Sequence, residues 1–405
     1  MNLSVAHTFE PGIIPRLAEF RAVKEIYGKL HRDCIGGGRA TFTLQRTSDL
    51  SLRKNIAEAH AHGIKFNYLI NAANLAGLEQ TRSGQIKIRA LLDYIDDAGA
   101  DGVTVSTPYL LRLVKGTHPR LKTRIGVFAV VDSAEKARQW EDLGADTICV
   151  SAIACNRDFG RLGAIRRSVA CTLELLVNAS CLPACAYELT HMNMLSQSSR
   201  TGDRLGGFNL DYCFLHCSTQ RLLNPVNFVK AVWIRPEDIA HYEAIGYTWF
   251  KIVERSCPGD LLIQRVRAYA ERSFDGNLYE LVAPIAQINR KLGASWLRRI
   301  RMAATMVKPW WVKMQTLLLM KEYAEAAIID TFAKENTPVC IDNRTLDGFL
   351  DGVRSRDCGS LRCDECGYCA GVAARAVTVN PQYRAEMIQR AAQLDHGLVF
   401  GEHWL

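Results

Sequence analysis

Residues 124–151 contain three successive pieces that decide the fold: Arg124-Ile-Gly-Val-Phe-Ala-Val130, Ser133-Ala-Glu-Lys-Ala-Arg-Gln-Trp-Glu-Asp-Leu143 and Thr147-Ile-Cys-Val-Ser151. The outer two are short apolar runs, typical of buried strands, and the middle one carries alanine and leucine at helical spacing. Gly144 follows the middle piece and marks a helix end. Strand, helix and strand in this order predict two parallel strands joined by a helical crossover.

The same alternation runs through about 250 residues, a length that suits a (β/α)8 barrel. The predicted strands are residues 3–8, 41–45, 65–71, 102–106, 124–130, 147–151, 174–178, 230–235 and 249–254, which leaves one segment surplus. An open doubly wound sheet is the alternative. We therefore predict an α/β protein with a (β/α)8 TIM-barrel-like catalytic domain over residues 1–285. A mostly helical, cysteine-rich region is expected over residues 286–405.

Bulk composition describes an ordinary globular chain of 405 residues with a net charge of +8, from 50 basic and 42 acidic residues. This mild excess permits an anionic partner without indicating nucleic acid. The first residues lack the charged start and apolar core of a secretory signal, so the 14 cysteines are expected to be reduced, in the cytoplasm, and available to metals. No apolar run reaches the roughly 18 residues that span a bilayer.

Polar side chains end several of the predicted strands, where the active groups of a barrel gather. The predicted site residues among them are Asn71, Asn178, Arg235, Lys251 and Glu254. The alternative is that loop-facing strand ends are polar in any globular protein. The run Gly36-Gly-Gly38 lacks the lysine spacing of a phosphate-binding loop and is interpreted as a flexible connection.

Two pairs of cysteines follow the seventh predicted strand, Cys181-Leu-Pro-Ala-Cys185 and Cys213-Phe-Leu-His-Cys217. Four thiolates suit an iron–sulfur cluster or a tetrahedral zinc ion, and gaps of three residues fit zinc less well. Coincidental core thiols are the remaining reading. His191 lies between the pairs and is a candidate ligand, proton donor or ordinary loop histidine.

A second group of cysteines lies within twelve residues near the C-terminus. It comprises Cys358, Cys363, Cys366 and Cys369, three of them at two-residue gaps. This spacing resembles the core of ferredoxin-type ligation but lacks the Cys-Pro that completes it. An iron–sulfur cluster is predicted here, with structural zinc as the alternative.

Over roughly residues 20–285 the chain resembles peptidase family U32, the collagenase-like proteases. The resemblance rests on an ordered series of motifs: Val23-Lys-Glu-Ile-Tyr27, Gly37-Gly-Arg39, Phe66-Asn-Tyr-Leu-Ile-Asn71, Val177-Asn178 with the two cysteine pairs, Trp233-Ile-Arg-Pro-Glu-Asp238, and Phe250-Lys-Ile252 with Arg255. It implies a barrel holding a 4Fe–4S cluster on Cys181, Cys185, Cys213 and Cys217. Many relatives space these thiols differently, and the C-terminal cysteine group adds to the usual pattern.

Characterised relatives resemble oxygen-independent hydroxylases, with prephenate implicated as the oxygen source in several. The predicted function is therefore iron–sulfur-dependent hydroxylation of a small organic intermediate, with a second cluster and an electron-donor protein as partners. The alternatives are hydroxylation of an RNA base, a U32-type peptidase, and a non-catalytic cluster-bearing protein. RNA would bind the basic, tryptophan-containing helices expected at residues 290–329, although packing of these helices on the barrel is the simpler account.

Overall fold

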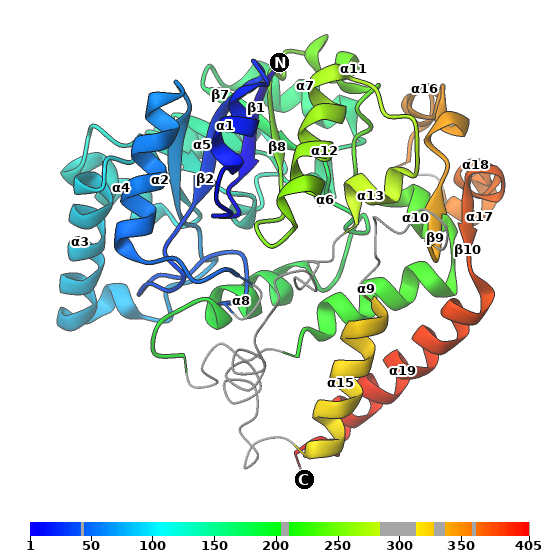
Figure 1. The fold of residues 1–405 in the computed structure, drawn as a ribbon. Coiled ribbons are helices and arrows are strands. Elements are labelled where there is room, and N and C mark those ends of the chain that lie inside the picture. The colour runs from blue at the N-terminus through cyan, green and yellow to red at the C-terminus, as the bar shows by residue number, and fades with distance from the viewer. Residues whose placement is uncertain (42–43, 204–209, 284–312, 328–336, 359–361, 405) are drawn as a thin grey trace. The chain divides into compact units, whose positions relative to one another are not determined.

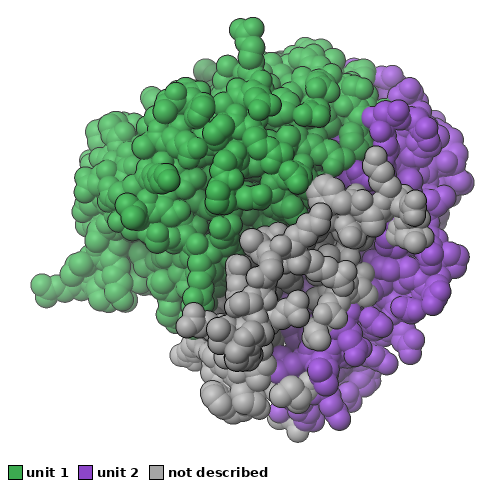
Figure 2. Space-filling view, viewed as in Figure 1, with its two compact units in different colours: residues 1–179, 183–209, 232–274 green, residues 180–182, 210–231, 275–405 purple. Residues whose placement is uncertain are grey.

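The computed structural model describes residues 1–41, 44–203, 210–283, 313–327, 337–358 and 362–404. The chain divides into two compact units, coloured separately in Figure 2. Unit 1 comprises residues 1–179, 183–209 and 232–274, and unit 2 comprises residues 180–182, 210–231 and 275–405. The sequence predicts a single boundary at residue 285, whereas the two units are discontinuous along the chain because helix α9 (Tyr212–Leu223) packs with the C-terminal helix α19 (Pro381–Val399).

Within the described residues of unit 1, eight parallel strands close into a barrel in chain order, which confirms the predicted (β/α)8 fold. The strands are β1 (Asn2–Ala6), β2 (Val23–Gly28), β3 (Lys65–Ile70), β4 (Gly102–Val105), β5 (Lys122–Ile125), β6 (Thr147–Cys149), β7 (Thr172–Leu176) and β8 (Trp249–Ile252). Strand β8 pairs with β1 and closes the ring.

Helices surround this barrel (Figure 1). They are α1 (Ile13–Ala18), α2 (Asp49–Ala61), α3 (Arg82–Asp97), α4 (Pro108–Thr117), α5 (Ala134–Asp142), α6 (Ala152–Cys155), α7 (Phe159–Ser168), α8 (Glu188–Ser198), α11 (Ile239–Glu243) and α12 (Gly259–Glu271). Several begin at a hydroxyl residue that accepts a backbone N–H three residues later, as Ser48, Thr81, Thr107 and Ser133 do. The predicted helix after Ser133 is thus confirmed as α5.

Two predicted strands are wrong and one strand was missed. Residues 41–45 contain a turn, in which Leu44 N–H donates to the Thr41 carbonyl, and residues 42–43 lie outside the described part of the chain. Lys230 ends a helix, and residues 231–235 are buried but join no sheet. Strand β2 was missed because Lys24 and Glu25 make it look polar, yet Glu25 points into the barrel and binds Arg124.

The barrel interior holds charged side chains where branched apolar ones are usual. Arg124 hydrogen-bonds Glu25 and lies 3.6 Å from a carboxylate oxygen of Glu174. The Lys251 Nζ lies 3.9 Å from the other Glu174 oxygen. Two cations therefore balance two carboxylates at the centre of the barrel.

Unit 2 is mostly helical, as predicted. Besides α9 and α19 it contains α10 (Val226–Lys230), α13 (Leu278–Val282), α15 (Met314–Ala327), α16 (Phe349–Arg354), α17 (Cys363–Cys366), α18 (Tyr368–Ala376), and the antiparallel pair β9 (Val339–Ile341) and β10 (Val377–Val379). Most of the predicted basic helical segment at 290–329 lies outside the described residues. None of the helices in the described ranges has the length and apolarity that crossing a membrane requires.

Candidate active site

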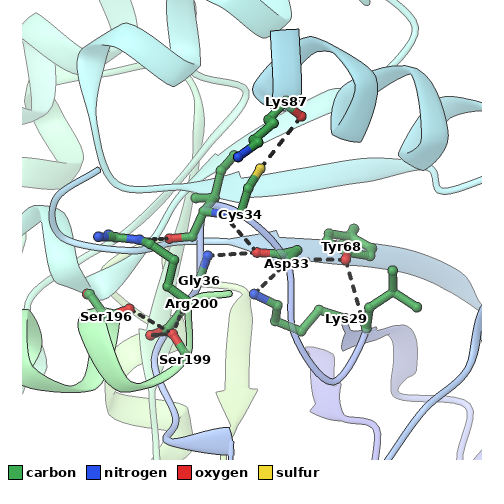
Figure 3. A network of polar contacts seen from close by, with 12 residues as sticks. Lys29, Asp33, Cys34, Gly36, Tyr68, Lys87, Ser196, Ser199 and Arg200 are labelled. Carbon is green, nitrogen blue, oxygen red and sulfur yellow. Dashed lines mark hydrogen bonds and ion pairs between the residues drawn. The ribbon is translucent and has the colours of Figure 1, made fainter. Parts of the chain in front are cut away.

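The loop after β2 is built on one buried carboxylate, Asp33 (Figure 3). Its Oδ1 accepts the backbone N–H groups of Ile35 at 3.1 Å and Gly36 at 2.7 Å. Its Oδ2 accepts the Tyr68 hydroxyl at 3.1 Å and lies 2.8 Å from the Lys29 Nζ. Burial lowers the pKa of Lys29, and the nearby Asp33 opposes that shift. The glycine run was interpreted as a flexible connection, but these contacts fix its start.

Helix α8 and the residues after it hold the same loop from the other side (Figure 3). Ser199 Oγ accepts the Gly37 N–H at 2.5 Å, and Arg200 Nε donates to the Ile35 carbonyl at 3.2 Å. The loop after β3 is held in the same way, because Ser196 Oγ accepts the Ala73 N–H at 2.8 Å. Helix α8 and residues 199–200 therefore lie at the carboxyl end of the barrel.

Glu254 follows β8 in a strained backbone conformation, with a φ of 101°. Its Oε2 accepts Arg39, the residue after the glycine run, at 2.6 Å, and its Oε1 accepts the Ser256 N–H at 3.3 Å. Burial would raise the pKa of Glu254, but Arg39 and Ser256 outweigh it and the pKa is lowered. This predicted site residue is therefore an ionised anchor that joins β8 to the glycine run.

Arg255 is the neighbouring cation, and its side chain is almost completely buried, at 7% exposure. Burial lowers its pKa to about 10, with Tyr27, Arg39 and Glu254 as further influences. Across the described residues, Arg255 has neither a hydrogen-bond nor an ion-pair partner. A buried guanidinium in this state lacks the anion that usually compensates such a charge.

Two predicted asparagines also lie at this end of the barrel. The Asn71 Oδ1 is buried without a hydrogen-bond partner in the described part of the chain, and it faces Gly37, where an added Cβ would lie 2.9 Å from it. Asn178 binds Val253 on both sides, accepting its N–H at 2.8 Å and donating to its carbonyl at 3.1 Å. Asn178 therefore links the segments after β7 and β8, whereas the Asn71 oxygen forms no hydrogen bond within the described residues.

The other predicted site residues lie elsewhere. Lys251 is inside the barrel, 4.0 Å above the centre of the Tyr27 ring and ion-paired with Glu174. Arg235 is buried, with its Nε 3.3 Å from a Glu237 oxygen. His191 is half-buried on α8. The structure therefore brings Asn71, Asn178 and Glu254 together at the end of the strands and sets Lys251 deeper.

The first cysteine group is divided between the units, with Cys185 in unit 1 and Cys181, Cys213 and Cys217 in unit 2. Within the described ranges, no three His, Cys, Asp or Glu side chains are placed to hold a metal ion together. Ligation by these four thiols stays a prediction.

One feature of unit 2 fits an anionic cluster. Buried Arg221 lies with its Nη2 3.7 Å from the Cys217 sulfur. Burial would lower the pKa of Arg221, but Cys217, Tyr279 and Cys181 outweigh it and the pKa is raised.

The second cysteine group lies around α17 and the start of α18. Cys358, Cys363 and Cys366 are exposed, and Cys369 is half-buried. Exposed thiols in one short segment remain accessible to iron or zinc, and a cluster here also stays a prediction.

Residues 37–212 match the model of Peptidase family U32. An uncharacterized protease of Methanocaldococcus jannaschii is 32% identical over 248 residues, which covers 61% of this chain and 72% of that protein. The chain belongs to peptidase family U32. The solved structure of the U32 peptidase Mk0906 is 20% identical, with a TM-score of 0.45, and the match covers 62% of this chain and 91% of that one.

In this U32 chain, sequence reasoning missed the cations that give the site its charge. Arg255 was noted at a strand end and in a motif but was not chosen as a site residue, Arg39 was quoted only as part of a motif, and Lys29 was not considered. Arg39 follows a glycine run and Arg255 follows a predicted strand end, and these positions could have indicated that both belong to the site. Their roles depend on which carboxylate pairs with which cation, and only the three-dimensional structure shows this.

Proposed function

We propose that this U32 protein is an iron–sulfur-dependent, oxygen-independent hydroxylase that binds an anionic organic substrate at the carboxyl end of its barrel. Family membership supports an enzyme, and the resemblance to cluster-bearing hydroxylases supports the reaction. The cluster would be held by Cys181, Cys185, Cys213 and Cys217, and when bound it would supply single-electron transfer. A second cluster on Cys358, Cys363, Cys366 and Cys369 would exchange electrons with a donor protein in the cytoplasm.

The observation that carries the substrate class is Arg255. Glu254, the carboxylate beside it in the chain, favours the charged form of Arg255, but its oxygens hydrogen-bond Arg39 and Ser256 and not Arg255. A guanidinium offers two parallel N–H groups that match a carboxylate. A substrate carboxylate would therefore supply the missing anion, and prephenate, the oxygen source that the resemblance implies, carries two.

The chain's own groups would then orient the substrate. The Asn71 Oδ1 would accept a substrate hydroxyl, since it is buried without a partner among the described residues. The loops joined to α8 through Ser196 and Ser199 would exclude water from the bound molecule. Exclusion of water strengthens each of these electrostatic contacts.

The test is calorimetric binding of prephenate to anaerobically prepared protein and to Arg255→Met. Loss of a charged hydrogen bond costs about 1.5–3 kcal/mol, so the dissociation constant should rise roughly ten- to hundredfold. Arg138→Met, which removes an exposed arginine from α5, is the matched control and should bind like the parent. Equal binding by parent and Arg255→Met would contradict the proposed role of Arg255.

A peptidase is the second candidate, because the family and the M. jannaschii relative carry that name. The cysteine thiols near the strand ends are poorly suited to act as the nucleophile of a peptidase. Burial raises the pKa of both Cys155 and Cys257 to about 12, so both are protonated at neutral pH and are weak nucleophiles. Release of fluorescent peptides from labelled gelatin by the metal-free protein, without reductant, would favour the peptidase.

RNA-base hydroxylation and a non-catalytic cluster protein remain as alternatives. Both predict different binding behaviour from a small-molecule enzyme. An RNA substrate would bind with an affinity that falls steeply as salt increases, which a filter-binding assay at several salt concentrations would measure.

A further inference from the structure

Arg221 of α9 is a buried cation for which unit 2 supplies no carboxylate. Its side chain is 2% exposed, and across the described residues it forms no ion pair with Asp or Glu. A guanidinium keeps its charge in a protein, because its pKa lies far above neutral pH. A lone charge buried in this way is costly unless an anion accompanies it.

The groups that hydrogen-bond Arg221 are neutral. Its Nη1 donates to the Ser180 carbonyl at 2.8 Å, and its Nη2 donates to Ser218 Oγ at 3.3 Å. The Nη2 also lies 3.7 Å from Cys217 Sγ, but that thiol donates its own hydrogen to the Phe214 carbonyl at 3.3 Å. A thiol that donates a hydrogen bond is protonated, so Cys217 does not supply the missing charge.

A small cavity inside unit 2 lies against Arg221. Its volume is about 20 Å³, which is room for about one water molecule. The polar residues that line it are Arg221, Ser218, Tyr279, Tyr323 and Tyr383, and the rest of the described lining is apolar. The cavity therefore combines a cation with hydroxyl groups, and no carboxylate is among the described residues around it.

The tyrosines of this cavity are neutral and keep their hydrogens. Burial raises the pKa of Tyr279, Tyr323 and Tyr383, and Arg221 opposes the shift in each, so the guanidinium lies near all of these phenols. Across the described residues, the hydroxyls of Tyr279 and Tyr383 form no hydrogen bond. Phenol O–H groups beside a guanidinium can donate to an anion, whereas a water molecule would leave the charge of Arg221 uncompensated.

We propose that this cavity of unit 2 binds one halide ion, such as chloride, beside Arg221. The volume selects this class of anion, because a halide is close to a water molecule in size, whereas phosphate, sulfate and carboxylates need more room. The ion would compensate Arg221 and connect α9, α15 and α19, which carry Ser218, Tyr323 and Tyr383. This inference is independent of the cluster of the proposed function, since Cys217 enters it only as a neutral thiol.

The experiment measures thermal unfolding of the whole chain, treated with chelator and reductant, in sodium chloride and in sodium gluconate of equal ionic strength. Gluconate is too large for the cavity, so only chloride should raise the unfolding temperature through binding to the folded protein. Arg221→Met should weaken chloride binding at least tenfold, because it removes charged hydrogen bonds. Tyr383→Phe removes one hydroxyl and should weaken it less. Arg384→Met, which removes a cation bound to carbonyls at the end of α9, is the matched control and should respond to chloride like the parent.

Crystals grown with bromide in place of chloride locate the ion, because bromide scatters X-rays anomalously. The expected result is an anomalous peak in the cavity beside Arg221. Equal unfolding temperatures of the parent in chloride and gluconate would overturn the inference, as would the parent's full response to chloride in Arg221→Met or a cavity that holds no bromide. If Arg221→Met does not fold, Tyr383→Phe takes its place, and an unchanged response to chloride in that variant would count against the site. Because these samples hold no cluster, neither result bears on the proposed function.

Discussion

The buried cationic side chains of unit 1 differ in whether a carboxylate pairs with them. Inside the barrel, Arg124 and Lys251 face Glu25 and Glu174, so each cation has a carboxylate. At the end of the strands, Arg255 has none in the described part of the chain. The first arrangement is complete without a ligand and stabilises the fold, whereas we propose that a bound anion completes the second.

The interior charges should therefore matter for stability. Arg124→Met would leave Glu25 and Glu174 buried without their shared cation, and breaking a buried ion pair costs about 3–5 kcal/mol. We expect urea to unfold this variant at a clearly lower concentration than the parent. Arg138→Met breaks an exposed pair with Glu135 and should cost less than about 1 kcal/mol. Equal midpoints for the two variants would show that the interior network is not structural.

His7 gives a pH-dependent contribution. It lies after β1, hydrogen-bonds Asn55 of α2 at 2.8 Å, and burial lowers its pKa from 6.5 to about 4. The unfolded chain then binds the proton more tightly than the folded one, so this stabilisation is complete above pH 6.5 and is lost as the pH falls toward 4. The loss is on the order of 3 kcal/mol.

His7→Gln removes the titrating group and keeps a hydrogen-bonding side chain. We expect thermal unfolding of this variant to change less between pH 7 and pH 5 than that of the parent. The same pH dependence in both proteins would assign the effect to other groups.

At the scale of elements, the loop after β2 is an ordered part of the site because α8 holds it. Gly36 has a φ of 86°, and a Cβ there would lie 2.7 Å from both the Ser196 carbonyl and Ser199 Oγ. Gly12 has a similar φ of 75° but open space around it. Comparing alanine substitutions at these two glycines therefore distinguishes the cost of backbone strain from the cost of steric crowding.

Gly36→Ala should combine both penalties, and Gly12→Ala only the first. Left-handed backbone costs alanine about 1–2 kcal/mol, and crowding adds about 1–3 kcal/mol. We expect Gly36→Ala to increase the exchange of the Gly37 amide hydrogen and to weaken prephenate binding, with Gly12→Ala changing neither. Unaltered Gly37 exchange in Gly36→Ala would mean that α8 does not hold the loop.

Apolar runs explain which elements could be predicted from the sequence. Apolar residues predominate in strands β3, β4 and β8, with one or two polar residues in each, and each strand was found within a few residues. Strand β2 contains Lys24 and Glu25, and the pairing of Glu25 with Arg124 exists only in the folded barrel, whereas residues 231–234 are apolar and buried without forming a strand. The spacing of apolar residues indicates which segments are buried, but pairing between segments distant in the sequence determines which of them form strands of the sheet.

The candidate site shows the same limit. Asn71, Asn178 and Glu254 were predicted because polar residues at strand ends of a barrel meet at one face. Lys251 lies in β8, three residues before Glu254, but its side chain is inside the barrel. The role of Arg255 depends on the nearby carboxylate of Glu254 being bound by Arg39, which is distant in the sequence. The spacing of residues in the sequence does not show whether a buried charged side chain has an ion-pair partner in the folded protein.

For the whole molecule, we propose that this U32 chain holds an iron–sulfur cluster on the cysteines after β7. Anaerobically purified parent, Cys181→Ala and Cys366→Ala should be compared by iron, acid-labile sulfide and zinc content and by electron paramagnetic resonance. We expect about four iron and four sulfide per cluster, with one cluster signal lost in Cys181→Ala and a different one in Cys366→Ala. Zinc without sulfide in the parent, or an iron–sulfur signal unchanged in Cys181→Ala, would contradict it.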